Sequence, residues 1–232
     1  MREYGAILLH GVTGSGKTRI YVEAAQAAIE RGRSAVILVP EIALTPQMVV
    51  RLRKDFSDRV AVLHSGLSLS ARYDTWRAIK EGLLPVVVGP RSAVFAPVPD
   101  LGVIVVDEEH EGTYKQSESP RYHARAVAIM RARLEKAVVV LGSATPSMES
   151  YRNAGEGKYA LVELGHRIDR GPLPDVEIVD MRGEATVDSA GAFSAALRDA
   201  VAAALGAEQQ VILFLNRRGY ASFVQCLGCG FS

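Results

Sequence analysis

Two groups of residues in this sequence are suited to act on a nucleoside triphosphate. The first is Gly11–Thr18, which reads GVTGSGKT and has the glycines, lysine and threonine of a phosphate-binding loop at the required spacing. The second is Asp107–His110, which reads DEEH and begins 89 residues after Thr18. The backbone N–H groups of such a loop surround phosphates, while acidic side chains hold a metal ion and position a water. Together the two groups predict hydrolysis of a nucleoside triphosphate.

Each residue of these groups has an expected role in that chemistry. The Lys17 ammonium should reach the β- and γ-phosphates, and the Thr18 hydroxyl should bind Mg²⁺. Asp107 should hold the same Mg²⁺, and Glu108 should orient or deprotonate the attacking water. We therefore predict Lys17, Asp107 and Glu108 as catalytic residues, with ATP and Mg²⁺ as cofactors. The predicted nucleotide-binding residues are Gly11, Val12, Thr13, Gly14, Ser15, Gly16, Lys17 and Thr18.

Short apolar runs that alternate with helix-like segments must position these groups. The runs are rich in Val and Ile, as in strands buried on both faces of a parallel sheet. They cover residues 6–9, 35–39, 60–63, 85–88, 103–106 and 137–141, and helix-like spacing covers 19–30, 46–56, 70–81 and 122–135. This alternation predicts an α/β fold with a mainly parallel, doubly wound sheet. Ligands of such a sheet lie at the carboxyl ends of its strands, where the motifs fall.

Composition favours a soluble globular protein. The 232 residues are 48% apolar and 23% charged, with a formal net charge of +1, so any basic surface must be local. No apolar run approaches the roughly 18 residues that span a bilayer, and the N-terminus does not have the pattern of a secretion signal. We expect a cytoplasmic protein that does not contact a membrane.

Three further segments follow predicted strands and suit contact with a nucleic-acid backbone. Residues 39–47, 89–95 and 142–146 offer backbone amides, hydroxyls and an arginine, which suit phosphate oxygens. Taken singly, each segment equally fits an ordinary turn with Pro or Gly. From these segments we predict DNA contacts by Thr45, Gln47 and Arg91, and coupling of the acid box to DNA by His110, Ser143 and Thr145.

The stretch from Gly112 to Arg125 mixes tyrosines with basic residues. From Thr113 to Lys136 there are six Lys or Arg and two Glu, a local net charge of +4. Aromatic and cationic side chains together suit stacking on unpaired bases and contact with their backbone. Composition alone also fits an ordinary surface loop that leads into a basic helix. The predicted DNA-binding residues here are Tyr114, Lys115, Arg121, Tyr122 and Arg125.

The two cysteines, Cys226 and Cys229, form one C-x-x-C pair. Such a pair occurs both in zinc knuckles and in redox motifs. A structural zinc site needs four ligands, and this pair supplies two of them. The spacing alone leaves both interpretations open, and as a zinc site the pair is half of one, which should not bind zinc stably as it stands.

These motifs jointly resemble superfamily 2 helicases, and more specifically the primosomal replication-restart DNA helicases. The DEEH tetrad looks like a DExH box, which speaks against the kinase and GTPase alternatives that a phosphate loop alone leaves open. The resemblance is carried, in the order of the family, by residues 11–18, 40–47, 107–110, 114–125, 142–147 and 214–220. It implies an ATP-dependent 3′→5′ DNA helicase that acts in the restart of stalled replication forks and in primosome assembly.

The same resemblance implies partners and a domain organisation. The implied partners are forked and single-stranded DNA, primosome proteins and single-stranded DNA-binding protein, in a cytoplasmic, nucleoid-associated setting. Segment 114–125 would link DNA binding to hydrolysis, and the full-length parent would bind Zn²⁺. We expect a RecA-like first domain at 1–155, a connector at 156–192, and at 193–232 the start of a second RecA-like domain with half of a zinc module.

Local patterns add to this organisation. We predict a turn at 153–157, a helix at 194–205 and a strand at 211–215. We expect a fragment of a longer helicase, with the first motor domain complete. The alternatives are a non-catalytic fragment that binds ATP and single-stranded DNA, and another superfamily 2 nucleic-acid-dependent ATPase.

Overall fold

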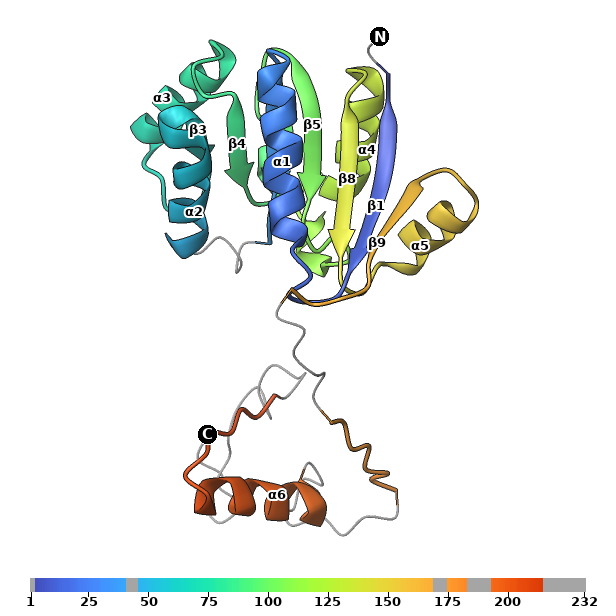
Figure 1. Cartoon of the computed structure of the whole chain (residues 1–232). Coiled ribbons are helices and arrows are strands. Elements are labelled where there is room, and N and C mark those ends of the chain that lie inside the picture. Colours follow the sequence, from blue (N-terminus) through green and yellow to red (C-terminus); the bar gives the residue numbers. More distant parts are fainter. Residues whose placement is uncertain (1–2, 41–45, 169–174, 183–192, 215–232) are drawn as a thin grey trace. The chain divides into compact units, whose positions relative to one another are not determined.

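Seven short segments form one sheet in which all neighbouring strands are parallel (Figure 1). The strand order is β3-β4-β2-β5-β8-β1-β9. Strands β2, β4 and β5 are buried at every residue, which explains why their sequences are continuously apolar. The strands are β1 (Gly5–Gly11), β2 (Ser34–Leu38), β3 (Val60–Val62), β4 (Val86–Gly89), β5 (Leu101–Val106), β8 (Val138–Ser143) and β9 (Ala160–Leu164).

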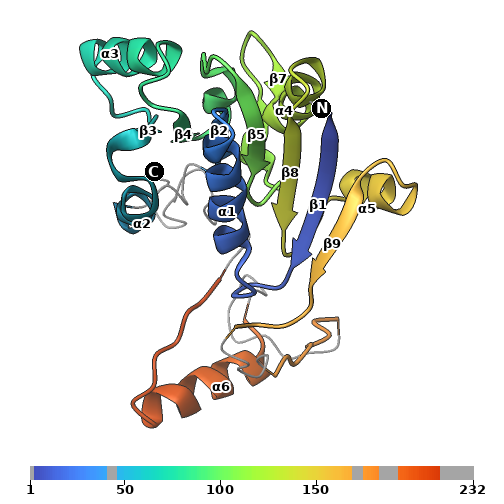
Figure 2. The ribbon, with the colours of Figure 1, turned by 45° about the horizontal axis from the view of Figure 1, so that its top comes forward.

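Helices cover both faces of this sheet (Figures 1 and 2). Alternate residues of β5 face opposite cores, because Val103 and Val105 pack with α1 and α2 while Ile104 and Val106 pack with α3 and α4. The helices are α1 (Lys17–Glu30) and α2 (Pro46–Phe56) on one face, and α3 (Leu69–Lys80), α4 (Ala124–Leu134) and α5 (Met148–Gly155) on the other. The predicted doubly wound α/β fold is confirmed, and the predicted strands and helices of this sheet end within two residues of the observed ones.

One edge of the sheet differs from the prediction. Helix α5 includes residues 153–155, so the turn predicted at 153–157 is wrong in its first three residues. Strand β9 follows, in the segment expected to be a connector, and pairs in parallel with β1. Four of the five residues of β9 are exposed, so the strand lacks the apolar run that marks the buried strands.

The structure describes residues 3–40, 46–168, 175–182 and 193–214, and the chain divides into one unit that ends at Gly171 and another that begins at Pro172. The described part of the second unit holds α6 (Ala195–Gly206), where the Ser194 hydroxyl caps the helix by accepting from the Leu197 N–H at 3.0 Å. The helix predicted there is confirmed. The strand predicted at 211–215 is wrong over its described residues 211–214, which are not in a strand.

Short elements connect the strands to the helices at the carboxyl edge. The segment expected to be a loop after the acid box is a small antiparallel hairpin that leads directly into α4 (Figure 2). These elements are the 3₁₀ turns η3 (Arg91–Phe95) and η4 (Gly112–Tyr114), and the hairpin strands β6 (Lys115–Gln116) and β7 (Tyr122–His123). A further 3₁₀ turn, η2 (Ser57–Arg59), joins the end of α2 to the start of β3.

Candidate functional site

The phosphate loop connects β1 to α1 at the carboxyl edge of the sheet. Gly14 and Gly16 have φ angles of 80° and 93°, which glycine adopts without the strain that a Cβ would cause. Gly16 is the N-cap of α1 and provides no side-chain cap, so the first N–H groups of the helix are available to an anion. Lys17 begins the helix, is 8% exposed, and donates from Nζ to the Gly11 carbonyl at 2.8 Å. Thr18 follows it in the first turn.

Asp107 lies directly after β5, and its N–H and its carboxylate are both held by hydrogen bonds. Its N–H donates to the Leu38 carbonyl at 2.9 Å, and its Oδ1 accepts from the Tyr21 hydroxyl at 2.9 Å and from the Glu108 N–H at 3.0 Å. Burial raises the pKa of the Asp107 carboxyl above its ordinary value, and the adjacent Glu108 carboxylate raises it further against the effect of the Tyr21 hydrogen bond. Burial likewise raises the pKa of the Tyr21 hydroxyl.

Glu108 connects the acid box to the phosphate loop. Its Oε1 lies 3.9 Å from Lys17 Nζ, its Oε2 lies 3.7 Å from His110 Nδ1, and its side chain is 34% exposed. Its backbone has a φ of 45°, in the left-handed region that residues with a Cβ rarely adopt. The structure thus brings together the three residues predicted to be catalytic, which come from positions 17, 107 and 108 of the sequence.

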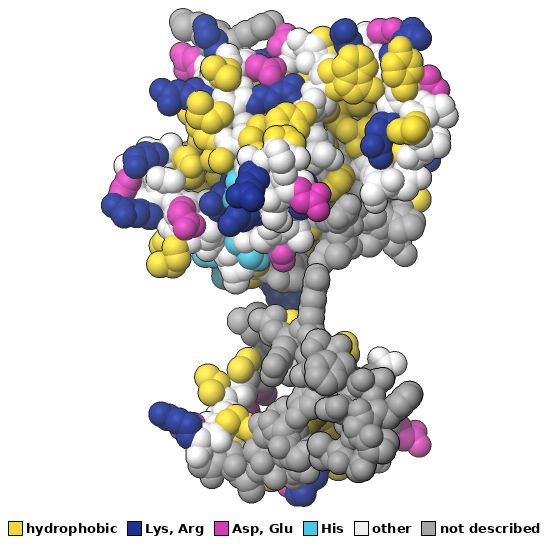
Figure 3. Space-filling view, turned by 180° about the vertical axis from the view of Figure 1, so that it is seen from behind, with side chains coloured by type: hydrophobic (Ala, Val, Ile, Leu, Met, Phe, Trp, Pro, Cys, Tyr) yellow, Lys and Arg dark blue, Asp and Glu magenta, His cyan; other side chains and the backbone are white. Residues whose placement is uncertain are grey.

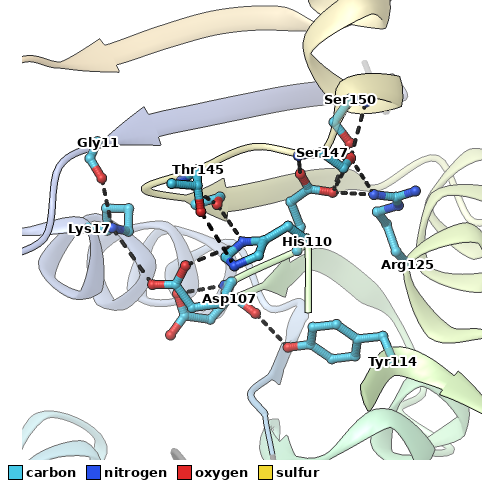
Figure 4. A network of polar contacts seen from close by, with 12 residues as sticks. Gly11, Lys17, Asp107, His110, Tyr114, Arg125, Thr145, Ser147 and Ser150 are labelled. Atoms are coloured by element: carbon cyan, nitrogen blue, oxygen red, sulfur yellow. Dashed lines mark hydrogen bonds and ion pairs between the residues drawn. The ribbon is translucent and has the colours of Figure 1, made fainter. Parts of the chain in front are cut away.

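The three residues predicted to couple hydrolysis to DNA also meet (Figure 4). His110 Nδ1 shares a hydrogen bond of 2.7 Å with the hydroxyl of Ser143, a fully buried residue at the end of β8. The Thr145 hydroxyl lies 3.5 Å from His110 Nε2, and the Thr145 N–H donates to Ser143 Oγ at 2.9 Å. The acid box and the segment after β8 therefore share one polar network.

A second network, which the sequence analysis missed, joins Arg125, Ser147 and Ser150 (labelled in Figure 4) to the carboxylate of Glu109. The side chain is fully buried, and its Oε2 accepts from Arg125 Nη1 at 2.5 Å, Ser150 Oγ at 2.8 Å and Ser147 Oγ at 3.1 Å. Its Oε1 accepts from the Ser147 N–H at 2.7 Å. Burial raises the pKa of Glu109, but the hydrogen bonds from Ser147, Arg125 and Ser150 outweigh it and hold the pKa below its ordinary value. Adjacent acids in the sequence gave no signal that one of them was buried.

The start of the hairpin is anchored to the acid box. Tyr114 is 1% exposed and donates from its hydroxyl to the Asp107 carbonyl at 2.6 Å, and burial raises the pKa of this hydroxyl. Arg91 donates to the carbonyls of Thr113 at 3.2 Å and Lys115 at 3.4 Å. Stacking of Tyr114 on a base is therefore wrong for this conformation, because the ring has no exposed face. Arg125, predicted to contact DNA, is likewise paired with Glu109.

The rest of the hairpin forms an accessible surface. Lys115 and Arg121 are exposed, and Tyr122 is half-buried with its ring 5.0 Å from that of Phe95 in an edge-to-face contact. Beside them lies a groove of about 420 Å³, lined by residues that include Pro90, Arg91, Phe95, Gln116 and Tyr122. Figure 3 shows the face of the first unit that carries α3 and α4, where Lys and Arg side chains are interspersed with hydrophobic ones.

Four predicted site residues have no described side chain. Thr45, Cys226 and Cys229 lie outside the described residues, and the side chain of Gln47 is not described although its backbone belongs to α2. Within the described ranges, no group of three or more His, Cys, Asp or Glu residues is placed to hold a metal ion. None of the helices in these ranges is long and apolar enough to cross a membrane.

Comparison with known proteins identifies the first unit. A DEAD/DEAH box helicase model matches residues 2–154, about two thirds of the chain. Replication restart protein PriA of Bacillus subtilis (strain 168) is 50% identical over 229 residues, which are 99% of this chain and 28% of that protein. The protein of the same name from Synechocystis sp. is 47% identical over 236 residues, with 100% and 28% coverage. The chain thus spans less than a third of the length of these curated relatives.

Solved structures support the fold. RecG bound to a three-way DNA junction matches with a TM-score of 0.50 and 24% identity, over 68% of this chain and 20% of that one. A hypothetical ATP-dependent RNA helicase from Sulfolobus tokodaii matches with a TM-score of 0.50 and 20% identity, over 68% and 48%. The first unit is therefore a RecA-like α/β domain of the kind found in helicases.

Proposed function

Since the chain belongs to the DEAD/DEAH box helicase family, we propose that it is the ATP-hydrolysing motor portion of a replication-restart DNA helicase. The observation that carries the proposal is the meeting of Lys17, Asp107 and Glu108 at one edge of the sheet, with Lys17 Nζ 3.9 Å from Glu108 Oε1. The restart process is inferred from the 50% identity to PriA over almost the whole chain.

The residues at this edge fit a magnesium-bound triphosphate. The helix N-terminus without a side-chain cap and the Lys17 ammonium suit phosphate oxygens, and the Thr18 hydroxyl with the Asp107 carboxylate is an oxygen ligand pair that suits Mg²⁺. Thr18 and Asp107 would hold the ion, which when bound neutralises charge on the phosphates. Lys17 would exchange the Gly11 carbonyl for a phosphate oxygen without leaving its helix.

Glu108 would act on the water. Its partly exposed carboxylate takes up a proton as the water oxygen attacks the terminal phosphorus and the bond from that phosphorus to the bridging oxygen breaks. His110 lies 3.7 Å from the same carboxylate and shares a hydrogen bond with Ser143. Through these two contacts the position of the Glu108 carboxylate would depend on the position of the segment after β8. The coupling role of His110, Ser143 and Thr145 is part of the proposal.

DNA would bind along the hairpin and the adjoining groove. Lys115 and Arg121 offer exposed cations for the phosphate backbone, and Tyr122 with Phe95 offers an aromatic surface on which a base can stack. Arg91 borders the same groove while it holds the start of the hairpin. Tyr114 would position the acid box and not contact a base.

The remaining expectations belong to the proposal for the longer protein. They are 3′→5′ unwinding, action on forked and single-stranded DNA, partnership with primosome proteins and single-stranded DNA-binding protein, a nucleoid-associated cytoplasmic location, and zinc bound through a site to which Cys226 and Cys229 contribute. The segment after residue 193 would begin a second RecA-like domain.

An ATPase assay of the chain with and without single-stranded DNA tests the function. We expect DNA-stimulated hydrolysis that Lys17→Ala abolishes, because the ammonium that neutralises the phosphates is lost. Lys54→Ala, at an exposed position of α2, is the matched control and should leave the rate unchanged. Tyr122→Ala should lose the stimulation and retain the basal rate. Binding of Mg–ATP without hydrolysis in either condition would refute the motor function of this chain and leave a nucleotide-binding role.

A further inference from the structure

The strained backbone of Glu108 is the starting point. Its φ of 45° lies in a region that costs free energy for any residue with a Cβ. Such conformations persist only where the surrounding contacts determine them, and they concentrate at functional sites. The side chain of Glu108 does not fix this conformation, since it is partly exposed, and Lys17 Nζ and His110 Nδ1 lie 3.9 and 3.7 Å from its oxygens. Its backbone is held by nearby residues, because the Glu108 N–H donates to Asp107 Oδ1 and the Glu108 carbonyl accepts from the Glu111 N–H. The conformation therefore depends on how these neighbours are themselves fixed.

Both neighbours of Glu108 are fixed. On one side, the Asp107 N–H donates to the Leu38 carbonyl at 2.9 Å, and the Asp107 carbonyl accepts from the Tyr114 hydroxyl at 2.6 Å. On the other side, the Glu109 N–H donates to the Gly142 carbonyl at 3.0 Å. The Glu109 side chain adds the contacts with Arg125, Ser147 and Ser150, which come from α4, from the N-cap of α5 and from its first turn.

This arrangement points to a role for Glu109 beyond packing. An ion pair with a buried carboxylate, such as that of Glu109 with Arg125, contributes little net stability compared with well-packed apolar residues of the same volume. The carboxylate of Glu109 has its hydrogen bonds to α4 and α5 and does not contact Lys17 or the phosphate loop. We propose that Glu109 is a positioning residue, whose buried contacts with Arg125, Ser147 and Ser150 hold Glu108 in its left-handed backbone conformation and thereby direct the Glu108 carboxylate. This inference rests on the ATPase function proposed above.

Replacement by glutamine should disturb this arrangement while the residue keeps its size. Each carboxylate oxygen faces a group that can only donate, Arg125 Nη1 at Oε2 and the Ser147 N–H at Oε1, so the amide N–H₂ of glutamine would meet a donor in either orientation. The matched control is Glu149→Gln. It removes the same charge 3.9 Å from Arg125 Nη2, but from a side chain that is 74% exposed. Ser150→Ala is a milder variant that removes one of the four hydrogen bonds to the Glu109 carboxylate.

The experiment measures steady-state kcat and KM for ATP in the full chain, with saturating single-stranded DNA. A displaced Glu108 should lower kcat by about 10–100-fold for Glu109→Gln, while KM for ATP stays within about twofold because the phosphate loop is untouched. Ser150→Ala should lower kcat by a smaller factor and likewise leave KM for ATP unchanged. Glu149→Gln should change neither constant. An unchanged kcat, or kcat and KM altered together, would overturn the inference. If Glu109→Gln fails to fold, Ser150→Ala decides the question: a lowered kcat with an unchanged KM supports the inference, and an unchanged kcat overturns it.

Amide hydrogen exchange tests the positioning without reference to turnover. In Glu109→Gln or Ser150→Ala, exchange should accelerate about tenfold or more at the N–H groups of Glu109 and Glu111, which bond to the Gly142 and Glu108 carbonyls, and not at β5. Unchanged exchange at these two amides would refute the inference. Failure of the wild-type chain to hydrolyse ATP would refute the proposed function alone, because the exchange result would still decide whether Glu109 fixes the acid box.

Discussion

The contact between Tyr21 and Asp107 offers a direct test of how the acid box is held. Tyr21 lies on α1, one turn after Lys17, and is 1% exposed. Its hydroxyl donates to Asp107 Oδ1 at 2.9 Å, between residues 86 positions apart in the sequence. Tyr21→Phe removes this hydroxyl and leaves the ring in the core. The change therefore isolates one buried hydrogen bond to a carboxylate.

The magnitude follows from the surroundings of that carboxylate. A hydrogen bond to a charged group contributes about 1.5–3 kcal/mol. Asp107 Oδ1 keeps the Glu108 N–H at 3.0 Å, so the carboxylate is not left without a donor and the cost should lie in the lower half of the range. We expect a loss of about 2 kcal/mol in the free energy of unfolding. For a domain of this size, that loss lowers the melting temperature by about 4–8 °C.

Urea and thermal denaturation of the full chain measure this loss. The control is Tyr73→Phe, at a position on α3 that is 61% exposed, which should change stability by less than about 0.5 kcal/mol. In an Asp107→Ala background the Tyr21 hydroxyl has lost its partner, so Tyr21→Phe should cost close to nothing, a coupling of about 2 kcal/mol. An equal cost of Tyr21→Phe in both backgrounds would show that the hydrogen bond does not hold Asp107.

Two further predictions concern the same region. At Gly142 a Cβ would lie 1.8 Å from the Tyr21 hydroxyl oxygen, and its strand, β8, is held between β1 and β5. Gly142→Ala should therefore lower the free energy of unfolding by about 3 kcal/mol. The control is Gly155→Ala, which should not lower it because no atom lies within 4 Å of the added Cβ. The second concerns pH. The pKa of Glu109 in the fold lies below its ordinary value of 4.5, so its ionised network stabilises the protein above pH 4.5, and this stabilisation is lost as the pH falls through the lowered pKa. In urea denaturation, Glu109→Gln should therefore lower the free energy of unfolding by about 3 kcal/mol near neutral pH and by progressively less below pH 4.5. A loss of stability that does not depend on pH would contradict this prediction.

The sequence predicted the buried part of the fold because burial leaves a pattern that can be read residue by residue. Strand β5 is apolar throughout since both of its faces are covered, and α2 has the spacing of a helix with one buried face. Strand β9 was missed because it lies at the edge of the sheet and is mostly exposed. The strand predicted at 211–215 has the composition of a strand, but none of the described residues pairs with its described part, 211–214.

The candidate site likewise contains residues whose place the sequence predicted and residues whose place it did not. Lys17, Asp107 and Glu108 were predicted because a phosphate ligand requires those residue types at a fixed spacing. Tyr114 was expected to face DNA, and its burial follows from the reversal of the chain after the acid box, which has no local signature in the sequence. Glu109 gave even less signal, since its partners lie 16 to 41 positions further along the chain. A charged residue beside two predicted catalytic residues looks solvent-exposed until its partners are known.

The acid box combines two carboxylates whose environments act in opposite directions on stability. Burial raises the pKa of Asp107, so at neutral pH its charge opposes folding, whereas the partners of Glu109 lower its pKa, so its charge favours folding. A carboxylate that is to bind Mg²⁺ must present its oxygens to the ligand, and it therefore cannot have all of them satisfied by the protein. Glu109, two residues further along the chain, accepts hydrogen bonds at both carboxylate oxygens from α4, from the N-cap of α5 and from its first turn. The favourable contacts of Glu109 thus offset part of the folding free energy lost by burying the Asp107 carboxylate. They lie one residue beyond the strained backbone of Glu108, where a rigid anchor has the greatest effect on the geometry of the site.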